Sequence, residues 1–452
     1  MSEHPLRVLI AGGGVGAVEA LLALRALAGD RVAVTMLAPD PMFRYRPLSV
    51  TEPFGLGVAR DLDLLEIALE HDATFLKDAL AAVDVADRKI VTAGGRTLDY
   101  DVLLLAVGAR GVEAVPGALT FRDNADGGNL RGVVTDLERG EIRRLAFTVP
   151  GGVSWSLGLY ELALLCASRA RELALAGVEL TLVTPESRPM EVFGVRGAEL
   201  VGELLERAGI EQMLGTRPVA YRDGALAVEG GRVLPCDAVV SLPALEGPAI
   251  SGIRQERGGF IAVDQFGAAF EAERVFAVGD ATWFPVKQGG IATQMADSAA
   301  SSIAALAGAA VDPQPFRPVL RGALLTEWGP RYLRTALAEA GPGDAARSVL
   351  WWPPSKVAGK YLAPYLAVRA GFRLGHGQLR DLEAPPGDDP GDLGGGHEDV
   401  VAMALSSANV HAKARDFSGA MRWLEVVEDL ELYLPRDYEA KRASWLELAR
   451  SD

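Results

Sequence analysis

The N-terminal residues alternate between short apolar runs and a helical pattern. Residues 7–11 form an apolar run of the kind that is buried on both faces of a parallel sheet, and this run stops at Gly12. From Val18 to Leu27 apolar residues recur with the period of a helix, and a second apolar run covers Val32 to Leu37. The pattern predicts a strand, a loop, a helix and a second strand, which together begin a parallel α/β fold.

The loop before the helix has the G-x-G-x-x-G/A spacing of a dinucleotide-binding turn. Gly12 would make the tight turn, Gly14 would let the backbone approach a pyrophosphate, and Ala17 would let the helix pack closely on the strand. The helix N-terminus adds free N–H groups and a positive dipole end. An acid after the second strand usually binds the adenosine ribose. Ala38 stands at that position, and Asp40 is the nearest candidate.

A second copy of this pattern follows in the chain. Residues 31–40 resemble residues 177–186, and the segment from Gly16 to Glu19 is echoed from Gly158 to Glu161. We therefore predict two dinucleotide folds. The loop after the strand at 145–149 is longer than its counterpart and does not present G-x-G-x-x-G.

The second loop offers weaker candidates for a nucleotide. Gly151 and Gly152 could cradle a phosphate, Glu186 could accept from an NAD ribose, and Arg188 could meet a 2′-phosphate. Equally, Glu186 and Arg188 could be solvated residues after a strand.

Length and composition exclude several classes of protein. A chain of 452 residues with 49% hydrophobic residues predicts two or three domains, and a formal charge of −15 argues against nucleic-acid binding. The two cysteines, Cys166 and Cys236, have no CxxC spacing, which excludes a disulfide framework, a thiolate zinc site and an iron–sulfur cluster. We interpret both as buried structural thiols. The five histidines are scattered, so we expect no metal site.

The N-terminus enters its first strand without the pattern of a signal peptide, and no apolar run is long enough to span a bilayer. We expect a cytoplasmic protein. Between Arg347 and Arg380, basic and aromatic residues are interleaved, which suits an interfacial helix at the inner membrane face that reaches a quinone. A dimer contact or a cap on the core is the alternative, and Pro364 would break the helix.

Two further strands end at glycines. One lies in residues 98–109 and ends at Gly108, and the other lies in residues 274–281 and ends at Gly279 and Asp280. Together with the first glycine loop, they resemble the YDxLxxAxGA and VFAxGD segments of two-dinucleotide-fold flavoproteins, the pyridine nucleotide-disulfide oxidoreductase superfamily. The resemblance covers about residues 5 to 312.

The resemblance implies an α/β fold with two Rossmann-like dinucleotide-binding domains, the first split in sequence, a C-terminal capping region and an α-helical tail. The domains expected from it are residues 1–112 with 246–312 for FAD, 113–245 for a second, NAD(P)-type domain, 313–382 for the cap, 383–397 for a flexible linker and 398–452 for the tail. The tail has the spacing of one helix-turn-helix unit of a tetratricopeptide repeat, so homodimerisation or partner docking through it is a further hypothesis.

The resemblance also implies roles for individual residues. Asp280 would bind the ribityl chain of FAD, and Gly108 would pack near the pyrophosphate. Lys287 and the helix from Ile291 would face the N1/O2 edge of the flavin and stabilise its reduced form. The implied FAD site comprises Gly12, Gly14, Gly16, Ala17, Asp40, Arg46, Pro47, Val107, Gly108, Gly279, Asp280, Lys287 and Gly290.

Within the superfamily, the sequence is most similar to sulfide:quinone oxidoreductases and flavocytochrome c sulfide dehydrogenases, and then to type II NADH dehydrogenases. The sulfide enzymes carry a redox cysteine where Trp155 stands here, which puts their mechanism in doubt for this chain. We predict that Trp155, Lys287 and Trp352 form the catalytic environment of the flavin.

These observations predict an FAD-dependent oxidoreductase. It would pass electrons from a small donor, with NAD(P)H as one candidate, to a quinone or another acceptor. Two alternatives stay open: a sulfide-type oxidoreductase without the redox cysteines, and a flavin-binding interaction protein with little turnover.

Overall fold

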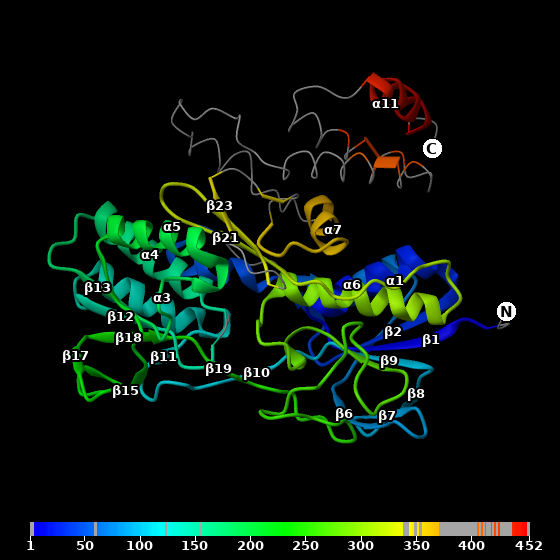
Figure 1. Ribbon diagram of the computed structural model, residues 1–452, viewed down its shortest axis with the longest axis horizontal. Coiled ribbons are helices and arrows are strands. Elements are labelled where there is room, and N and C mark those ends of the chain that lie inside the picture. Colours follow the sequence, from blue (N-terminus) through cyan, green and yellow to red (C-terminus); the bar gives the residue numbers. More distant parts are fainter. Residues whose placement is uncertain are drawn as a thin grey trace. The chain divides into compact units, whose positions relative to one another are not determined.

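The computed structural model describes residues 4–57, 61–122, 124–153, 155–337, 343–347, 350–351 and 355–369, together with 405, 408, 409, 412, 417, 420, 421, 424 and 436–449. The chain forms two compact units (Figure 1). The larger comprises Met1–Ser348 and Pro353–Leu382, and the smaller comprises Val349–Trp352 and Glu383–Asp452.

The first part of the larger unit is a parallel sheet of five strands. Two long helices, α1 (Val15–Ala28) and α6 (Gly289–Leu306), pack against each other beside it (Figure 1). In order across the sheet, the strands are β20 (Val275–Ala277), β9 (Val102–Leu105), β1 (Leu6–Ala11), β2 (Val32–Ala38) and β5 (Thr74–Lys77).

A second parallel sheet of five strands repeats this architecture. The strands, in order, are β11 (Leu119–Thr120), β18 (Ala238–Ser241), β12 (Arg144–Thr148), β13 (Glu179–Val183) and β14 (Ile210–Met213). Its helices are α3 (Asn124–Glu138), α4 (Leu157–Glu172) and α5 (Gly194–Ala208). The prediction of an α/β protein with two Rossmann-like folds is therefore confirmed.

Short elements complete the two folds. Two antiparallel strands, β10 (Arg110–Val112) and β19 (Ala244–Glu246), pair where the chain passes between the two sheets. The remaining strands are β3 (Met42–Arg44) with β4 (Asp61–Asp63), β6 (Leu80–Asp84) with β7 (Lys89–Thr92) and β8 (Thr97–Asp99), and β15 (Pro218–Arg222) with β16 (Ala225–Val228) and β17 (Val233–Pro235). The remaining helical elements are α2 (Leu64–Glu70) and the 3₁₀ turns η1 (Gly29–Arg31), η2 (Arg46–Phe54), η3 (Glu191–Phe193) and η4 (Gly279–Ala281).

The capping region begins with an antiparallel sheet and ends in a short helix, α7 (Leu362–Arg369). Pro364 does not break this helix. It is the third residue of α7, where a backbone N–H would have no intrahelical acceptor, so the ring costs little there. Membrane contact by this region stays a prediction. The sheet consists of β21 (Val319–Leu324), β22 (Arg331–Ala336) and β23 (Asp344–Ala346).

Two buried glutamates fasten the capping region to the dinucleotide folds. Glu19 in α1 accepts hydrogen bonds from the backbone N–H groups of Tyr361 (2.9 Å) and Leu362 (2.6 Å) at the start of α7. Glu161, at the equivalent position of α4, accepts from the N–H of Leu325 at 2.7 Å and pairs with the ammonium group of Lys356. Each fold thus uses the helix after its glycine loop to hold the C-terminal segment.

The smaller unit contains the helical tail. Helix α11 (Arg436–Ala449) lies within the predicted α-helical tail, and Trp445 packs in a small core with Ala408, Ala420 and Leu424. The predicted linker, residues 383–397, lies outside the described residues. Among the described residues, no helix is long and apolar enough to cross a membrane.

The contacts of Glu19 lead to a stability prediction. We expect Glu19→Ala to lower the free energy of unfolding by about 2–4 kcal/mol, because it leaves a buried N–H group, that of Leu362, and a partly buried one, that of Tyr361, without an acceptor. Glu19→Gln keeps an acceptor oxygen and should lose about 1 kcal/mol or less. Chemical denaturation measures both, with the exposed Glu206→Gln as control. Equal losses for the two Glu19 variants would contradict this account.

Candidate functional site

The N-terminus of α1 is open to a ligand. Gly12 has a φ of 133°, and a Cβ built on it would lie 2.2 Å from the carbonyl oxygen of Ala106, so only glycine fits the tight turn. Gly14 is exposed, caps the helix, and has no atom within 4 Å of a Cβ built on it. Ala17 is fully buried, as close packing of the helix requires. This turn fits a pyrophosphate.

Two neighbouring strand ends meet the same edge of the sheet. β9 runs towards Val107 and Gly108, and β20 runs towards Gly279 and Asp280. Gly108 has a φ of 73° and no atom within 4 Å of a built Cβ. The carboxyl ends of parallel strands are where such folds bind their ligands, so these residues extend the α1 site along the sheet edge. They are the candidates for binding the remainder of an FAD molecule.

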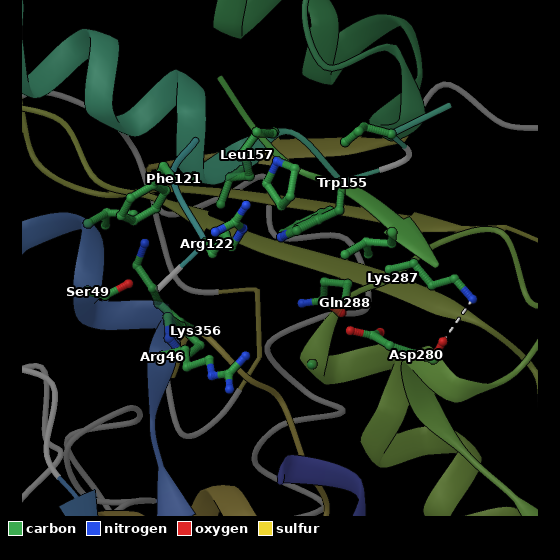
Figure 2. A pocket seen from close by; sticks show the side chains of 18 of the residues that line it. Arg46, Ser49, Phe121, Arg122, Trp155, Leu157, Asp280, Lys287, Gln288 and Lys356 are labelled. Carbon is green, nitrogen blue, oxygen red and sulfur yellow. Dashed lines mark hydrogen bonds between the residues drawn. The ribbon is translucent and has the colours of Figure 1, made fainter. Parts of the chain in front are cut away.

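Beyond this edge lies a cavity of about 500 Å³, with walls from both dinucleotide folds. Figure 2 shows Phe121, Arg122, Leu157 and Trp155 along one side of it and Asp280, Gln288, Arg46 and Lys356 along the other. The sequence predicted Arg46, Pro47, Trp155, Asp280 and Lys287, and the structure brings these residues together around one space.

Lys287 is a partly buried side chain of the cavity wall. Its ammonium group donates to the carbonyl oxygen of Asp280 at 3.2 Å (Figure 2). It also donates to the carbonyl oxygen of Thr282 and lies 4.0 Å from the ring centroid of Phe260. Burial lowers the pKa of Lys287 to about 8, although the charge of Asp280 acts against this shift. Burial also raises the pKa of Asp280, and Lys287 and Arg46 oppose that change.

The loop after Lys287 starts helix α6. Gln288 caps it by accepting from the N–H of Ile291 at 2.9 Å, and its amide donates to the carbonyl of Arg321 at 3.2 Å. Gly289 lines the cavity, whereas Gly290 is buried in the first helical turn. The positive end of the α6 dipole therefore lies at the cavity wall.

The second fold contributes an aromatic wall. Trp155 lines the cavity and packs edge-to-face on Phe193, with ring centroids 5.9 Å apart. Phe121 and Pro243 complete this side of the cavity. Both cysteines are buried elsewhere in the folds, and burial raises the pKa of the Cys166 thiol to about 12. The cavity lining contains no cysteine among the described residues.

Sequence reasoning missed a buried ion pair in the cavity lining, between Glu161 and Lys356. Their side chains are only 1% and 5% exposed. Burial raises the pKa of Glu161 and lowers that of Lys356, while each charge opposes the shift of the other. The repeated segments align Glu161 with Glu19, and this match could have identified one partner of the ion pair. No sequence pattern identified Lys356 as the other.

Of the remaining candidates, Gly152 alone lines the cavity among the described residues. Asp40 accepts from the N–H of Met42 at 3.0 Å and from Arg44 at 3.2 Å, and its side chain is 48% exposed. Gly151 and Gly152 are exposed, with Gly152 at the cavity, and Arg188 is exposed. Trp352 lies outside the described residues.

The chain has two dinucleotide folds, an open glycine turn and a cavity shared by both folds. These features define an oxidoreductase that is built from two dinucleotide folds and uses a dinucleotide cofactor. Residues 6–301 match the family model of the pyridine nucleotide-disulphide oxidoreductases, and the chain belongs to this family of FAD-dependent enzymes.

Known relatives include both ferredoxin reductases and a sulfide:quinone oxidoreductase. The ferredoxin–NAD(+) reductase component of the biphenyl dioxygenase system of Paraburkholderia xenovorans is 29% identical over 63% of this chain and 69% of its own. The ferredoxin reductase component of chlorobenzene dioxygenase from a Cupriavidus species is 30% identical over 64% and 70%. The solved sulfide:quinone oxidoreductase of Aquifex aeolicus superposes with a TM-score of 0.71 at 17% identity over 84% of this chain and 95% of that one, which shows a shared fold.

The position of Asp280 gives a prediction for cofactor binding. If its carboxylate holds FAD, Asp280→Ala should purify with most of its FAD lost, and Asp280→Asn, which keeps an acceptor oxygen, should lose less. The ratio of flavin to protein absorbance measures occupancy, and thermal unfolding checks that the variants are folded. Full flavin occupancy in folded Asp280→Ala would remove Asp280 from the site.

Proposed function

We propose that this enzyme passes electrons from a small donor through FAD to a quinone or a similar small acceptor. The observation that carries the proposal is the single cavity walled by Asp280 and Lys287 on the first fold and by Trp155 and Phe121 on the second. The lining joins apolar side chains to convergent charged ones, among them Arg46, Arg122 and Lys287, and such a cavity suits a small planar molecule.

The chain's residues would hold the cofactor in three places. Gly12, Gly14 and the N-terminus of α1 would bind the pyrophosphate, and Asp280 would accept a hydrogen bond from the ribityl chain. Lys287 and the N-terminus of α6 would place positive charge beside the flavin ring, which supplies the redox chemistry when bound. These groups favour the added negative charge that reduction brings.

The acceptor would lie between the flavin site and the aromatic wall. Arg46 and Arg122 add positive charge around this space, and Trp155 and Phe121 offer flat apolar faces. Because the cavity lining contains no cysteine among the described residues, a sulfide oxidation that forms a bond to a cavity thiol has no nucleophile there. The lining therefore counts against the sulfide-type alternative.

The proposed reaction is tested on the FAD-loaded enzyme without oxygen. We expect photoreduced enzyme to be reoxidised by a short-chain benzoquinone or naphthoquinone much faster than free reduced FAD, with a rate that saturates in quinone. Stopped-flow absorbance of the flavin measures this rate. A rate no faster than that of free FAD would favour a flavin-binding interaction protein instead.

The pKa of Lys287 predicts a pH dependence of the flavin potential. Below about pH 8 the lysine is charged and stabilises the reduced flavin. Lys287→Met should therefore lower the midpoint potential of the flavin by about 30 mV or more, which is a tenfold change in the redox equilibrium constant of a two-electron couple. As pH rises above about 8 the lysine loses its proton, so the difference from wild type should shrink. Lys287→Arg should keep a higher potential at high pH, and a constant difference across pH would count against this role.

A further inference from the structure

The segment that leads into α7 contacts both of the helices that pack beside the first sheet. Residues 357–362, called the strap below, are held by α6 and by α1. The hydroxyl of Thr293 in α6 donates to the carbonyl of Ala358 at 3.2 Å, and Glu19 in α1 accepts two backbone N–H groups of the strap. The first residue of the strap, Val357, lines the cavity. The position of the strap therefore sets part of the cavity wall.

A second carboxyl group meets Glu19 from α6. The side chains of Asp297 and Glu19 are hydrogen-bonded to each other. Glu19 is fully buried, and the Oδ1 atom of Asp297 is shielded from solvent and accepts no hydrogen bond from the described residues. An ionised carboxylate has no hydrogen to donate, so two of them cannot form this bond. One of the two carboxyl groups therefore carries a proton.

The hydrogen bonds of Glu19 assign this proton to Asp297. Oε1 of Glu19 accepts from the N–H of Tyr361, and Oε2 accepts from that of Leu362, so Glu19 is the acceptor on both oxygens. Asp297 is then the donor, and a neutral acid tolerates an unpaired buried oxygen better than a carboxylate does. Burial raises the pKa of Asp297 well above its ordinary value, and the charge of Glu19 raises it further.

Two other titratable side chains act on this pair among the described residues, and both lie in the strap. Lys360 is exposed, and its positive charge opposes the rise in the pKa of Asp297. Burial raises the pKa of Tyr361, so its hydroxyl stays neutral near neutral pH. Because the two carboxyl groups interact directly, they titrate as a unit that loses one proton as the pH rises.

We propose that Asp297 is a positioning residue: the proton that it shares with Glu19 holds the strap at the cavity, and loss of this proton at higher pH loosens the strap. Without the proton, two neighbouring carboxylates repel each other with no donor between them. Asp297 acts through Glu19, since it does not itself line the cavity. The inference does not depend on which molecule accepts the electrons.

The stability test compares FAD-loaded wild type with Asp297→Asn. The asparagine amide can donate to Glu19 as the protonated acid does, but it does not titrate. Because the pKa of Asp297 is raised in the folded protein, its stabilisation is present at low pH and is lost as the pH rises through that pKa. We expect the folding equilibrium constant of wild type, relative to the variant, to fall about tenfold or more between about pH 5 and pH 8. Chemical denaturation measures it, and the exposed Glu206→Gln should follow wild type.

Hydrogen exchange tests the strap itself. Protection factors correct for the intrinsic exchange rate at each pH, and mass spectrometry gives them for peptides that cover residues 356–362. We expect protection to fall with rising pH in wild type and to stay level in Asp297→Asn. Glu19→Gln is a second variant, because its amide can donate to Asp297, so its protection should depend less on pH than that of wild type.

Three results would contradict the proposal. A stability difference between wild type and Asp297→Asn that stays constant across this pH range would overturn the shared proton. A difference that changes with pH while the protection of the strap does not would overturn the role of Asp297 in holding the strap. If Asp297→Asn does not fold, Glu19→Gln decides the question, and a pH dependence equal to that of wild type would sink the proposal.

Discussion

The arrangement of the cavity depends on two buried carboxylates, Glu19 and Glu161. They occupy equivalent positions in α1 and α4, the helices that follow the glycine loops of the two dinucleotide folds, and both accept backbone N–H groups from the C-terminal part of the larger unit. A buried carboxylate without partners is costly, so each glutamate requires that segment to be in place. The capping region in turn gains fixed positions relative to both sheets.

The segment held in this way forms part of the functional site. Lys356 and Val357 line the cavity, and the N–H of Val357 donates to the hydroxyl of Tyr45 at 3.1 Å. The ammonium group of Lys356 balances the charge of Glu161, and both side chains are almost fully buried. Such pairs contribute little net stability but are costly to break, because a single buried charge would remain. Stability and the shape of the cavity are therefore linked through the same contacts.

The sequence predicted the local parts of this architecture well. A glycine turn between a strand and a helix depends only on neighbouring residues. Local sequence therefore predicted the turn at Gly12 and Gly14 and the strands on either side of α1. Glu161 and Lys356 are 195 positions apart in the chain, and no periodic pattern of neighbouring residues indicates such a long-range contact. Pro364 was misjudged because its effect depends on where the helix begins, which is set by the N–H groups that Glu19 accepts.

The repeats also show how a duplicated fold can come to differ through few changes. Both keep the strand, the turn and a glutamate in the helix that follows, which the packing of the cap requires. Their loops can differ, because the pyrophosphate of one FAD molecule needs only one open helix N-terminus. With hydroxyls at Tyr160 and Thr184, the acid after the second strand, Glu186, is satisfied inside the fold, at 2.7 and 2.9 Å.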